Sequence, residues 1–382
     1  MPAGRTPQYY DAIVLGAGAA GLMCAATAGK RGRRVVVIEH TDQAGAKILI
    51  SGGGRCNFTN LNVAPHCFLS ENPHFCRSAL SRYSETDFIA LVARHRIAYH
   101  EKTLGQLFCD GSARAVVDML LAECGAGSVD IRLGETVTAA ERADRFAVET
   151  SGGRYEAPAL VLATGGLSIP KMGASGLSHD IARRFGLAII APRPGLVALR
   201  LPPTGTFFDP ALAGVSLETV ASFDKARFRE RMLVTHRGLS GPAILQISSY
   251  WRPGEPITLD FAPGANPAAL LVDAKRLRPR AMLQTVLADL LPDRLARSLV
   301  AADLKPVELA NIPDRALNLF GARLAAMTVT PTGSEGYAKA EVTVGGVDTH
   351  ELSSKTMQAQ KVAGLFVIGE AVDVTGWLGG YN

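Results

Sequence analysis

The sequence lacks the paired cysteines of a metal or dithiol site. Its 382 residues include six cysteines, and no two of them form a C-x-x-C pair. Zinc binding and thioredoxin-type chemistry are therefore not indicated, and we predict no metal and free thiols in a reducing compartment. All six lie in the first third of the chain, at Cys24, Cys56, Cys67, Cys76, Cys109 and Cys124.

The sequence also lacks a recognisable leader and a long unbroken apolar run. Residues 1–11 do not combine a basic start with an apolar block, as a secretory signal would. The most apolar early run, 13–28, is interrupted by Gly16, Gly18 and Gly21, which argues for a strand, a turn and a helix instead of a membrane span. We expect a cytoplasmic protein with no membrane partner.

No strong excess of one charge is present. Hydrophobic residues make up 47% of the chain and charged residues 20%, a balance typical of a globular protein with two or three domains. The net charge of +5 permits an anionic partner but is below that of most dedicated nucleic-acid binders. Basic clusters at 30–34, 227–231 and 276–280 could bind RNA phosphates or could be solvated faces. None interleaves aromatic residues as a single-strand stacking surface does.

Residues 10–39 are typical of a dinucleotide-binding unit. A short apolar strand at 10–15 precedes the sequence GAGAAG, an Ala-rich helix follows to Lys30, and a second strand at 33–38 ends at Glu39. The glycines allow a tight turn, a close approach to a diphosphate and close packing of helix on sheet, and the helix start faces the diphosphate. Glu39 has the spacing expected for a ribose ligand. The predicted cofactor contacts here are Gly16, Ala17, Gly18, Ala19, Ala20, Gly21, Glu39 and His40.

Later segments favour FAD over NAD. Residues 160–166 form an apolar strand that ends in Ala163, Thr164, Gly165 and Gly166, and 364–373 form another that leads to Gly369, Glu370 and Asp373. In two-dinucleotide-type flavoproteins such strands return beside the cofactor, with Asp373 placed to accept a ribityl hydroxyl. We also predict a middle strand at 130–137, whose Val137 could present its backbone to the adenine.

The segment Lys47–Asn60 (KILISGGGRCNFTN) contains three consecutive glycines followed by Arg-Cys-Asn. A backbone of this kind can lie flat against a planar ring, and Arg55 can supply positive charge to an anion. The predicted contacts are Lys47, Ser51, Gly52, Gly53, Gly54, Arg55, Cys56 and Asn57, together with Gly379, Gly380, Tyr381 and Asn382 at the end of the chain.

Taken together, several motifs resemble the BaiN/YhiN-like NAD(P)/FAD-dependent oxidoreductases. They are the GGGRCN loop, His236–Pro242 (HRGLSGP), 345–347 (GGV), 355–357 (KTM) and 376–382 (GWLGGYN). The resemblance implies an α/β protein with a two-dinucleotide-type Rossmann-like FAD domain (1–191 and 341–382), an inserted β-barrel-like domain (192–265 and 326–340) and a small helical domain (266–325). Family members continue past GGYN into a helix that completes the flavin site, so we expect a segment beyond Asn382 to be missing from this sequence.

Strand-like alternation at 196–201, 215–223 and 257–261, and helical periodicity after the N-cap candidate Asn266, agree with that division. Five prolines from Pro192 to Pro210 suit a crossing between domains.

The resemblance implies reduction of carbon–carbon double bonds, which the family carries out in steroid enones and in a uridine of ribosomal RNA. Our first hypothesis is an FAD enzyme that reduces a conjugated double bond in a small molecule of unknown identity. The alternatives are a ribosomal RNA dihydrouridine synthase and a non-catalytic FAD-binding redox protein. A second GxGxxG unit is lacking, so we expect NAD(P)H to dock transiently as electron donor.

Such a reduction also needs a proton donor. Cys56, His236 and Tyr381 are the candidates, with Cys56 and His236 predicted as catalytic. Arg55 could lower the pKa of the Cys56 thiol. The alternatives are that Cys56 packs as a small apolar side chain and that His236 supports its own glycine-rich turn. The Ser240-Gly-Pro sequence lacks the features of a nucleophile elbow, which argues against hydrolysis.

Overall fold

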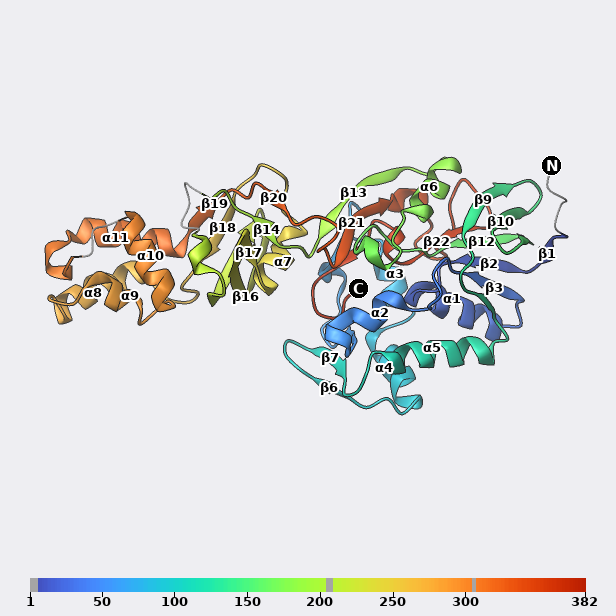
Figure 1. Cartoon of the computed structure of the whole chain (residues 1–382), viewed down its shortest axis with the longest axis horizontal. Coiled ribbons are helices and arrows are strands. Elements are labelled where there is room, and N and C mark those ends of the chain that lie inside the picture. Colours follow the sequence, from blue (N-terminus) through green and yellow to red (C-terminus); the bar gives the residue numbers. More distant parts are fainter. Residues whose placement is uncertain (1–5, 204–208, 304–306) are drawn as a thin grey trace. The chain divides into compact units, whose positions relative to one another are not determined.

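The chain forms two compact units. One comprises residues 1–193 and 342–382 and the other 194–341; both are drawn in Figure 1. The computed structural model describes residues 6–203, 209–303 and 307–382. A further separation of 266–325 from the β-rich part of the second unit stays a prediction.

A five-stranded parallel sheet forms the centre of the first unit. Short runs of Val, Ile and Leu that end at glycine or polar residues are typical of strands buried on both faces. In sheet order the strands are β22 (Leu365–Val367), β12 (Ala159–Leu162), β2 (Ala12–Leu15), β3 (Val35–Ile38) and β8 (Asp130–Arg132). Segments from both ends of the chain therefore share one sheet.

Different layers cover the two faces of this sheet. Helices α1 (Ala19–Lys30) and α5 (Arg114–Ala126) pack against the face that carries Val14, Val37 and Val161. The other face packs against α6 (Leu177–Arg184) and a second sheet of β1 (Gln8–Tyr9), β11 (Arg154–Ala157), β10 (Phe146–Thr150) and β9 (Val137–Arg142).

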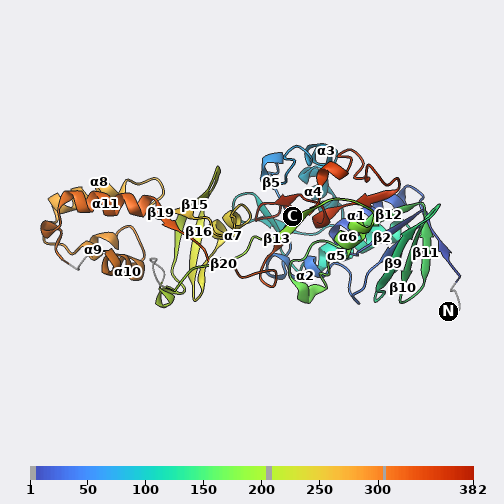
Figure 2. The same cartoon turned by 90° about the horizontal axis from the view of Figure 1, so that it is seen from above.

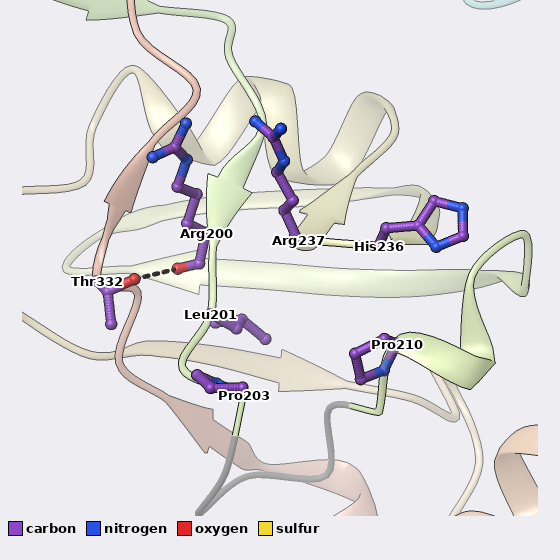
Figure 3. Close-up of a pocket in the computed structure, with 7 residues that line it drawn as sticks. All are labelled: Arg200, Leu201, Pro203, Pro210, His236, Arg237 and Thr332. Carbon is purple, nitrogen blue, oxygen red and sulfur yellow. Dashed lines mark hydrogen bonds between the residues drawn. The ribbon is translucent and has the colours of Figure 1, made fainter.

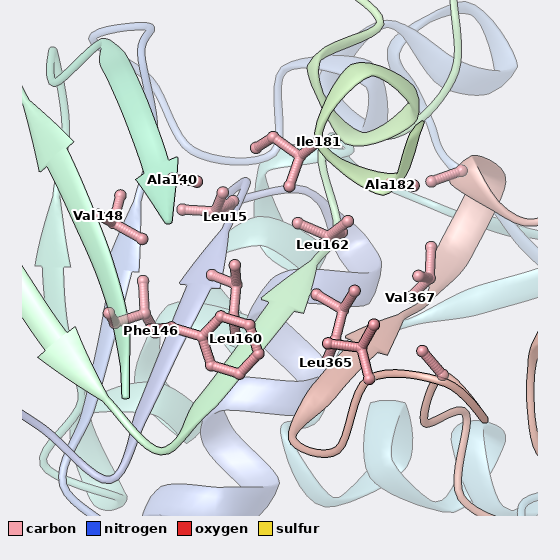
Figure 4. Close-up of a cluster of buried hydrophobic side chains, with 14 of the residues drawn as sticks. Leu15, Ala140, Phe146, Val148, Leu160, Leu162, Ile181, Ala182, Leu365 and Val367 are labelled. Carbon is pink, nitrogen blue, oxygen red and sulfur yellow. The ribbon is translucent and has the colours of Figure 1, made fainter. Parts of the chain in front are cut away.

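The second face is the apolar centre of the unit. Figure 4 shows Leu15, Leu160 and Leu162 of the parallel sheet meeting Phe146 and Ile181. All five side chains are at most 2% exposed. Burying a leucine of this kind contributes about 1.5–3 kcal/mol to folding, so this layer holds the strand ends in place.

The prediction of a single strand over residues 130–137 was wrong. Its first residues form β8 of the parallel sheet, and its last residue begins β9 of the second sheet. The exposed residues Leu133 and Gly134 separate the two. An apolar pattern of this length cannot show that a chain changes sheets in its middle.

Several further elements belong to the first unit. They are α2 (Ala46–Ile50), the 3-10 turn η1 (Ser51–Gly54), α3 (Arg77–Leu80), α4 (Glu85–Arg94), the sheet of β4 (Asn57–Asn60), β7 (Gln106–Cys109) and β6 (Tyr99–Glu101), the pair β5 (Phe68–Leu69) and β23 (Thr375–Gly376), the pair β13 (Ile189–Gly195) and β21 (Val342–Val347), and the 3-10 turn η7 (Gly369–Ala371).

The second unit is built on a seven-stranded sheet. Helix α7 (Pro242–Ser248) packs against its central strands. In sheet order the strands are β19 (Met327–Val329), β18 (Ile257–Asp260), β15 (Ser216–Phe223), β16 (Ala226–Thr235), β17 (Gly238–Ser240), β14 (Leu199–Arg200) and β20 (Gly333–Ser334).

The helices of the second unit that follow β18 lie beyond the edge strand β19 of that sheet, as Figure 2 shows. They are α8 (Pro267–Leu277), α9 (Leu283–Leu287), α10 (Asp293–Asp303) and α11 (Asp314–Ala325). The predicted N-cap is confirmed, because the Ala269 N–H donates to the Asn266 side-chain oxygen at 3.2 Å. The strand expected at 196–201 is shorter and covers only β14.

Candidate functional site

The glycine-rich turn between β2 and α1 leaves an open space at its centre. Gly16 has a φ of +105°, which lets the chain turn out of the strand. A Cβ on Gly21 would overlap the Gly16 carbonyl oxygen, so only glycine allows the helix to pack this closely. At Gly18, by contrast, a Cβ would have nothing within 4 Å. The turn is therefore closed on the protein side and open at Gly18.

The start of α1 is free to bind an anion. Gly18 is the N-cap residue, no side chain caps the helix, and its first turn contains no acidic residue. Unpaired N–H groups and the helix dipole favour a negative group at such a helix start. The open Gly18 position and the uncapped helix fit the diphosphate of a dinucleotide.

Glu39 lies directly beside this turn. The Ala17 N–H donates to Glu39 Oε2 at 2.9 Å, and the Thr41 N–H donates to Oε1 at 3.0 Å. His40 Nδ1 is 3.0 Å from the same Oε1. A carboxylate with remaining acceptor capacity at this place fits the ribose role predicted from the sequence.

Val137 comes near the same place through the backbone. The Gly134 N–H donates to the Thr41 carbonyl and the Glu135 N–H to the Glu39 carbonyl. Val137 follows two residues later as the partly buried first residue of β9. Its contact with an adenine stays a prediction.

A charged network joins four distant segments. Lys47 Nζ on α2 donates to Glu370 Oε2 at 2.9 Å and to Ser168 Oγ at 2.7 Å. Glu370 Oε1 accepts from the Ser168 hydroxyl at 3.0 Å and from the Thr343 N–H at 2.7 Å. The Lys47 and Glu370 side chains are 36% and 22% exposed, so the pair remains accessible to a ligand.

Two glycines allow the segments of this network to pack closely, one of them against the start of α1. A Cβ on Gly369 would lie 2.8 Å from the Ala20 Cβ, and a Cβ on Gly166 would overlap the Thr343 hydroxyl. Ala163 and Thr164 follow β12, and Thr164 exchanges hydrogen bonds with Ser178. The ends of β2 and β12, the turn η7 and α2 therefore converge on one place.

The triple-glycine loop is open on one side. A Cβ on Gly52 would contact the Phe108 ring at 2.8 Å, whereas one on Gly53 would meet nothing within 4 Å. Gly53 has a φ of +68°, a conformation that glycine adopts without strain. Arg55 is exposed, and Ser51 donates its hydroxyl to the Ile48 carbonyl.

The C-terminal motif packs against the strand that follows this loop. Asn60 Nδ2 donates to the Gly379 carbonyl at 2.9 Å. In the amide orientation that satisfies its neighbours, the Asn57 oxygen accepts from the Gly380 N–H at 3.1 Å. Asn382 closes the motif by bonding to Gly376, and the Tyr381 ring is 6.1 Å from Trp377. The structure thus brings the two predicted segments together.

The two predicted catalytic residues are in different settings. Cys56 is 5% exposed and lies in an apolar cluster with Val14 and Cys109. Burial raises the pKa of the Cys56 thiol. This is the opposite of the lowering of the Cys56 pKa that the neighbouring Arg55 predicts. The structure favours the packing role for Cys56. His236 is exposed in the turn between β16 and β17 of the second unit.

Asp373 is not brought to the open side of the site. It is 3% exposed, and its Oδ2 accepts from the Glu71 N–H at 2.9 Å. Burial raises the pKa of this carboxyl. Of the two acids predicted in this segment, Glu370, and not Asp373, directly follows the glycine that approaches Ala20 of α1.

Sequence reasoning missed Ser168 and Thr343, which position Glu370. Both are at most 1% exposed. A signal was present, since Ser168 follows the predicted Gly165-Gly166 pair by two residues and Thr343 precedes the GGV motif by two. Single polar residues in apolar segments do not reveal their partners.

The described residues offer neither a metal-binding cluster nor a membrane-spanning helix. Among residues 6–203, 209–303 and 307–382, no group of three or more His, Cys, Asp or Glu side chains could hold a metal ion. Over the same ranges, no helix has the length and apolar character needed to cross a bilayer.

Comparisons with known proteins match almost the whole chain. The model of a family described as the HI0933-like protein Rossmann domain matches residues 10–382. The chain is 49% identical to the ribosomal RNA dihydrouridine synthase of Escherichia coli (strain K12), with 98% of this chain and 94% of that protein covered. It is 27% identical to the 3-dehydro-bile acid delta(4,6)-reductase of Clostridium scindens (strain ATCC 35704 / DSM 5676 / VPI 13733 / 19), with 97% and 94% covered.

A solved structure shows a similar fold. The 3-ketosteroid-delta4-(5alpha)-dehydrogenase from Rhodococcus jostii RHA1, solved in complex with 4-androstene-3,17-dione, matches with a TM-score of 0.51 and 14% identity. The match covers 98% of this chain and 92% of that chain. The likeness concerns the fold alone.

Proposed function

The chain belongs to the HI0933-like Rossmann-domain family, and from this premise we propose that it is an FAD-dependent oxidoreductase that reduces the carbon–carbon double bond of a uridine in ribosomal RNA. The observation that carries the proposal is the convergence of the open Gly18 turn, Glu39 and the Lys47–Glu370 pair at one place. The choice of substrate is supported by the 49% identity to a ribosomal RNA dihydrouridine synthase.

The residues of this chain have distinct roles in the proposal. The start of α1 would hold the diphosphate, and Glu39 would accept hydrogen bonds from the adenosine ribose. Lys47, held by Glu370 and Ser168, presents positive charge at the open side of the site. The Gly52–Gly54 backbone would contact the flavin ring system. When bound, FAD would supply the hydride chemistry, with electrons taken from transiently docked NADH or NADPH.

The proton that completes the reduction needs an accessible source. Cys56 is buried and its pKa is raised, so a neutral, enclosed thiol is a poor candidate. His236 is exposed but lies in the second unit. We propose that the proton comes from an exposed side chain or from water at the open side of the site.

A steroid-like enone is the second candidate substrate. A small conjugated molecule is the first hypothesis from the sequence, and the similarity to a bile acid reductase favours it. That relative is 27% identical, whereas the ribosomal RNA relative is 49% identical over a similar length. The difference in identity favours RNA over the small molecule.

The test uses the full chain with both substrates. Purified protein should be yellow and should release FAD, not FMN, on acid treatment. Incubated with NADH or NADPH and an unmodified ribosomal RNA transcript, it should convert a uridine to dihydrouridine, detected by mass spectrometry as a gain of two hydrogen atoms. Turnover of a steroid enone without RNA turnover would transfer the function to the second candidate. Bound FAD that neither NADH nor NADPH bleaches would favour the non-catalytic alternative.

A further inference from the structure

The two faces of β16 in the second unit differ sharply. The positions from Phe228 to Val234 that alternate toward α7 are largely buried, and Gln246 of α7 donates to Glu230 at 3.3 Å. Because side chains alternate along a strand, the intervening positions point to the opposite face. Three of those positions are exposed arginines, namely Arg227, Arg229 and Arg231.

Two more arginines adjoin this row. Arg200 of β14 lies opposite Gly238 of β17, and Gly238 lies opposite Thr235 of β16. Residues directly opposite in antiparallel strands share a face, so Arg200 points the same way as the β16 arginines. Arg237, in the turn between β16 and β17, reaches the same carboxylate as Arg200, with Glu335 at 2.6 Å from Arg200 and 3.3 Å from Arg237.

A hollow lies beside this pair. Figure 3 shows the Arg200 and Arg237 side chains extending in the same direction, with His236 next to them in the turn. The hollow has a volume of about 300 Å³, and its lining combines these three polar residues with Thr332 and three apolar residues, Leu201, Pro203 and Pro210. Cationic groups above an apolar lining suit a phosphate with an attached sugar or base.

We propose that this arginine face, consisting of Arg200, Arg227, Arg229, Arg231 and Arg237, binds the phosphate backbone of the RNA substrate. The inference rests on the proposed function. Arginines at alternate positions of a strand are about 7 Å apart, which forms a row suited to successive phosphates. Guanidinium groups bind phosphate oxygens with two parallel hydrogen bonds. His236 and Arg237 belong to a motif that the cofactor site does not use.

The face keeps an excess of positive charge. Glu218, Asp260 and Glu335 share it with the five arginines. Glu218 pairs with Arg229 at 2.8 Å, but both side chains are more than half exposed, so the pair is weak and open to exchange. Within the described ranges 6–203, 209–303 and 307–382, no ion pair involves Arg227 or Arg231.

The other two basic clusters fit the role less well. Lys30 pairs with Glu123, and Arg34 lies over the Tyr10 ring at 4.6 Å. That cluster follows the C-terminal end of α1. The proposed diphosphate position is at the N-terminal end, one helix length of about 18 Å away. In the third cluster, Arg276 and Arg278 pair with Asp273 and Asp289.

The test removes two arginines from the face. The double variant Arg227→Gln/Arg231→Gln should bind an unmodified ribosomal RNA transcript roughly tenfold more weakly. The slope of log affinity against log salt should fall by about 1.4, which corresponds to two lost contacts to single-stranded phosphate. The matched control Arg276→Gln/Arg297→Gln removes the same charge from α8 and α10 of the same unit and should leave the affinity within about twofold of wild type and the salt slope unchanged.

Equal weakening in both double variants, or none in the first, would overturn the inference. FAD content and thermal unfolding check that each variant is folded. A second variant, Arg227→Lys/Arg231→Lys, keeps the charge and loses the paired hydrogen bonds, so it should bind with intermediate affinity. If the lysine variant binds RNA as weakly as the glutamine variant, positive charge alone does not replace the two parallel hydrogen bonds of a guanidinium group. That result still supports direct contact with phosphate.

The same experiment separates this inference from the proposed function. If wild-type protein forms dihydrouridine but the glutamine variant keeps full RNA affinity, the inference fails and the function stands. If wild-type protein binds RNA through these arginines but forms no dihydrouridine with NADH or NADPH, the function fails and the inference stands.

Discussion

The two units use their charged side chains in different ways. In the first unit, Glu39 and the Lys47–Glu370 pair tie together segments that are far apart in sequence, and their carboxylates are mostly enclosed. In the second unit, Arg229 and Arg237 stand out from an open sheet face with more than half of each side chain exposed. Charge held by several fixed partners suits a tightly positioned cofactor, whereas exposed charge suits a long, exchangeable polyanion.

The largest expected effect comes from the glycine-rich turn. In Gly21→Ala the new methyl group would overlap the Gly16 carbonyl oxygen, and helix and strand would have to separate. We expect a loss of about 3 kcal/mol in the free energy of unfolding, measured by denaturant titration together with loss of bound FAD.

Gly18→Ala is the matched control for this substitution. Its methyl group would meet no protein atom within 4 Å, so the free energy of unfolding should stay near wild type. FAD affinity alone should fall, because the methyl group enters the space reserved for the diphosphate. If Gly18→Ala binds FAD as well as wild type, the diphosphate lies elsewhere.

The next effect concerns the ribose contact. Glu39→Ala removes a charged acceptor beside the turn, and FAD affinity should fall by about tenfold to a hundredfold, equivalent to about 1.5–3 kcal/mol. Fluorescence titration of the protein stripped of FAD measures this directly. An unchanged affinity for FAD would show that Glu39 only accepts hydrogen bonds from the Ala17 and Thr41 N–H groups and does not bind the ribose.

The pH dependence of the free energy of unfolding tests whether water reaches the interior of the first unit. Burial, the first of several causes, raises the pKa of Cys109 to about 11, while a thiol in the unfolded chain ionises near its ordinary value, about 8.5. The folded state then holds a proton that the unfolded state releases, so stability is complete below about pH 8.5 and falls as pH rises toward 11.

The free energy of unfolding should fall by up to about 1.4 kcal/mol per pH unit from this group over that window. Cys109→Ala should reduce the slope, measured by urea unfolding at each pH. Identical slopes in the two proteins would mean that the thiol titrates normally and that water reaches this part of the interior.

The smallest effect compares one ion pair from each unit. Lys47→Met breaks a pair that also includes Ser168 and should cost about 1 kcal/mol, since the pair is partly enclosed. Arg229→Met breaks the exposed pair with Glu218 and should cost less than about 0.5 kcal/mol. Thermal unfolding of both variants checks the order, and a reversed order would contradict the comparison of the two units.

Local sequence patterns determined much of the first unit. The apolar run before Gly16, the Ala-rich helix to Lys30 and the strand to Ile38 are confirmed as β2, α1 and β3. Each of these elements is determined by residues a few positions apart in the chain. Glycines at a fixed spacing are therefore enough to predict the strand, the turn and the helix. The same holds for the N-cap at Asn266.

Only the tertiary structure decided which of the predicted residues meet. Lys47 and Glu370 are 323 positions apart, and their contact with Ser168 depends on how β12, β21 and α2 pack. Likewise, the Cys56 side chain lies in the interior because of the packing around β4 and β7, which no local pattern shows. Local conformation follows from neighbouring residues, whereas burial and long-range pairing depend on the packing of the whole unit.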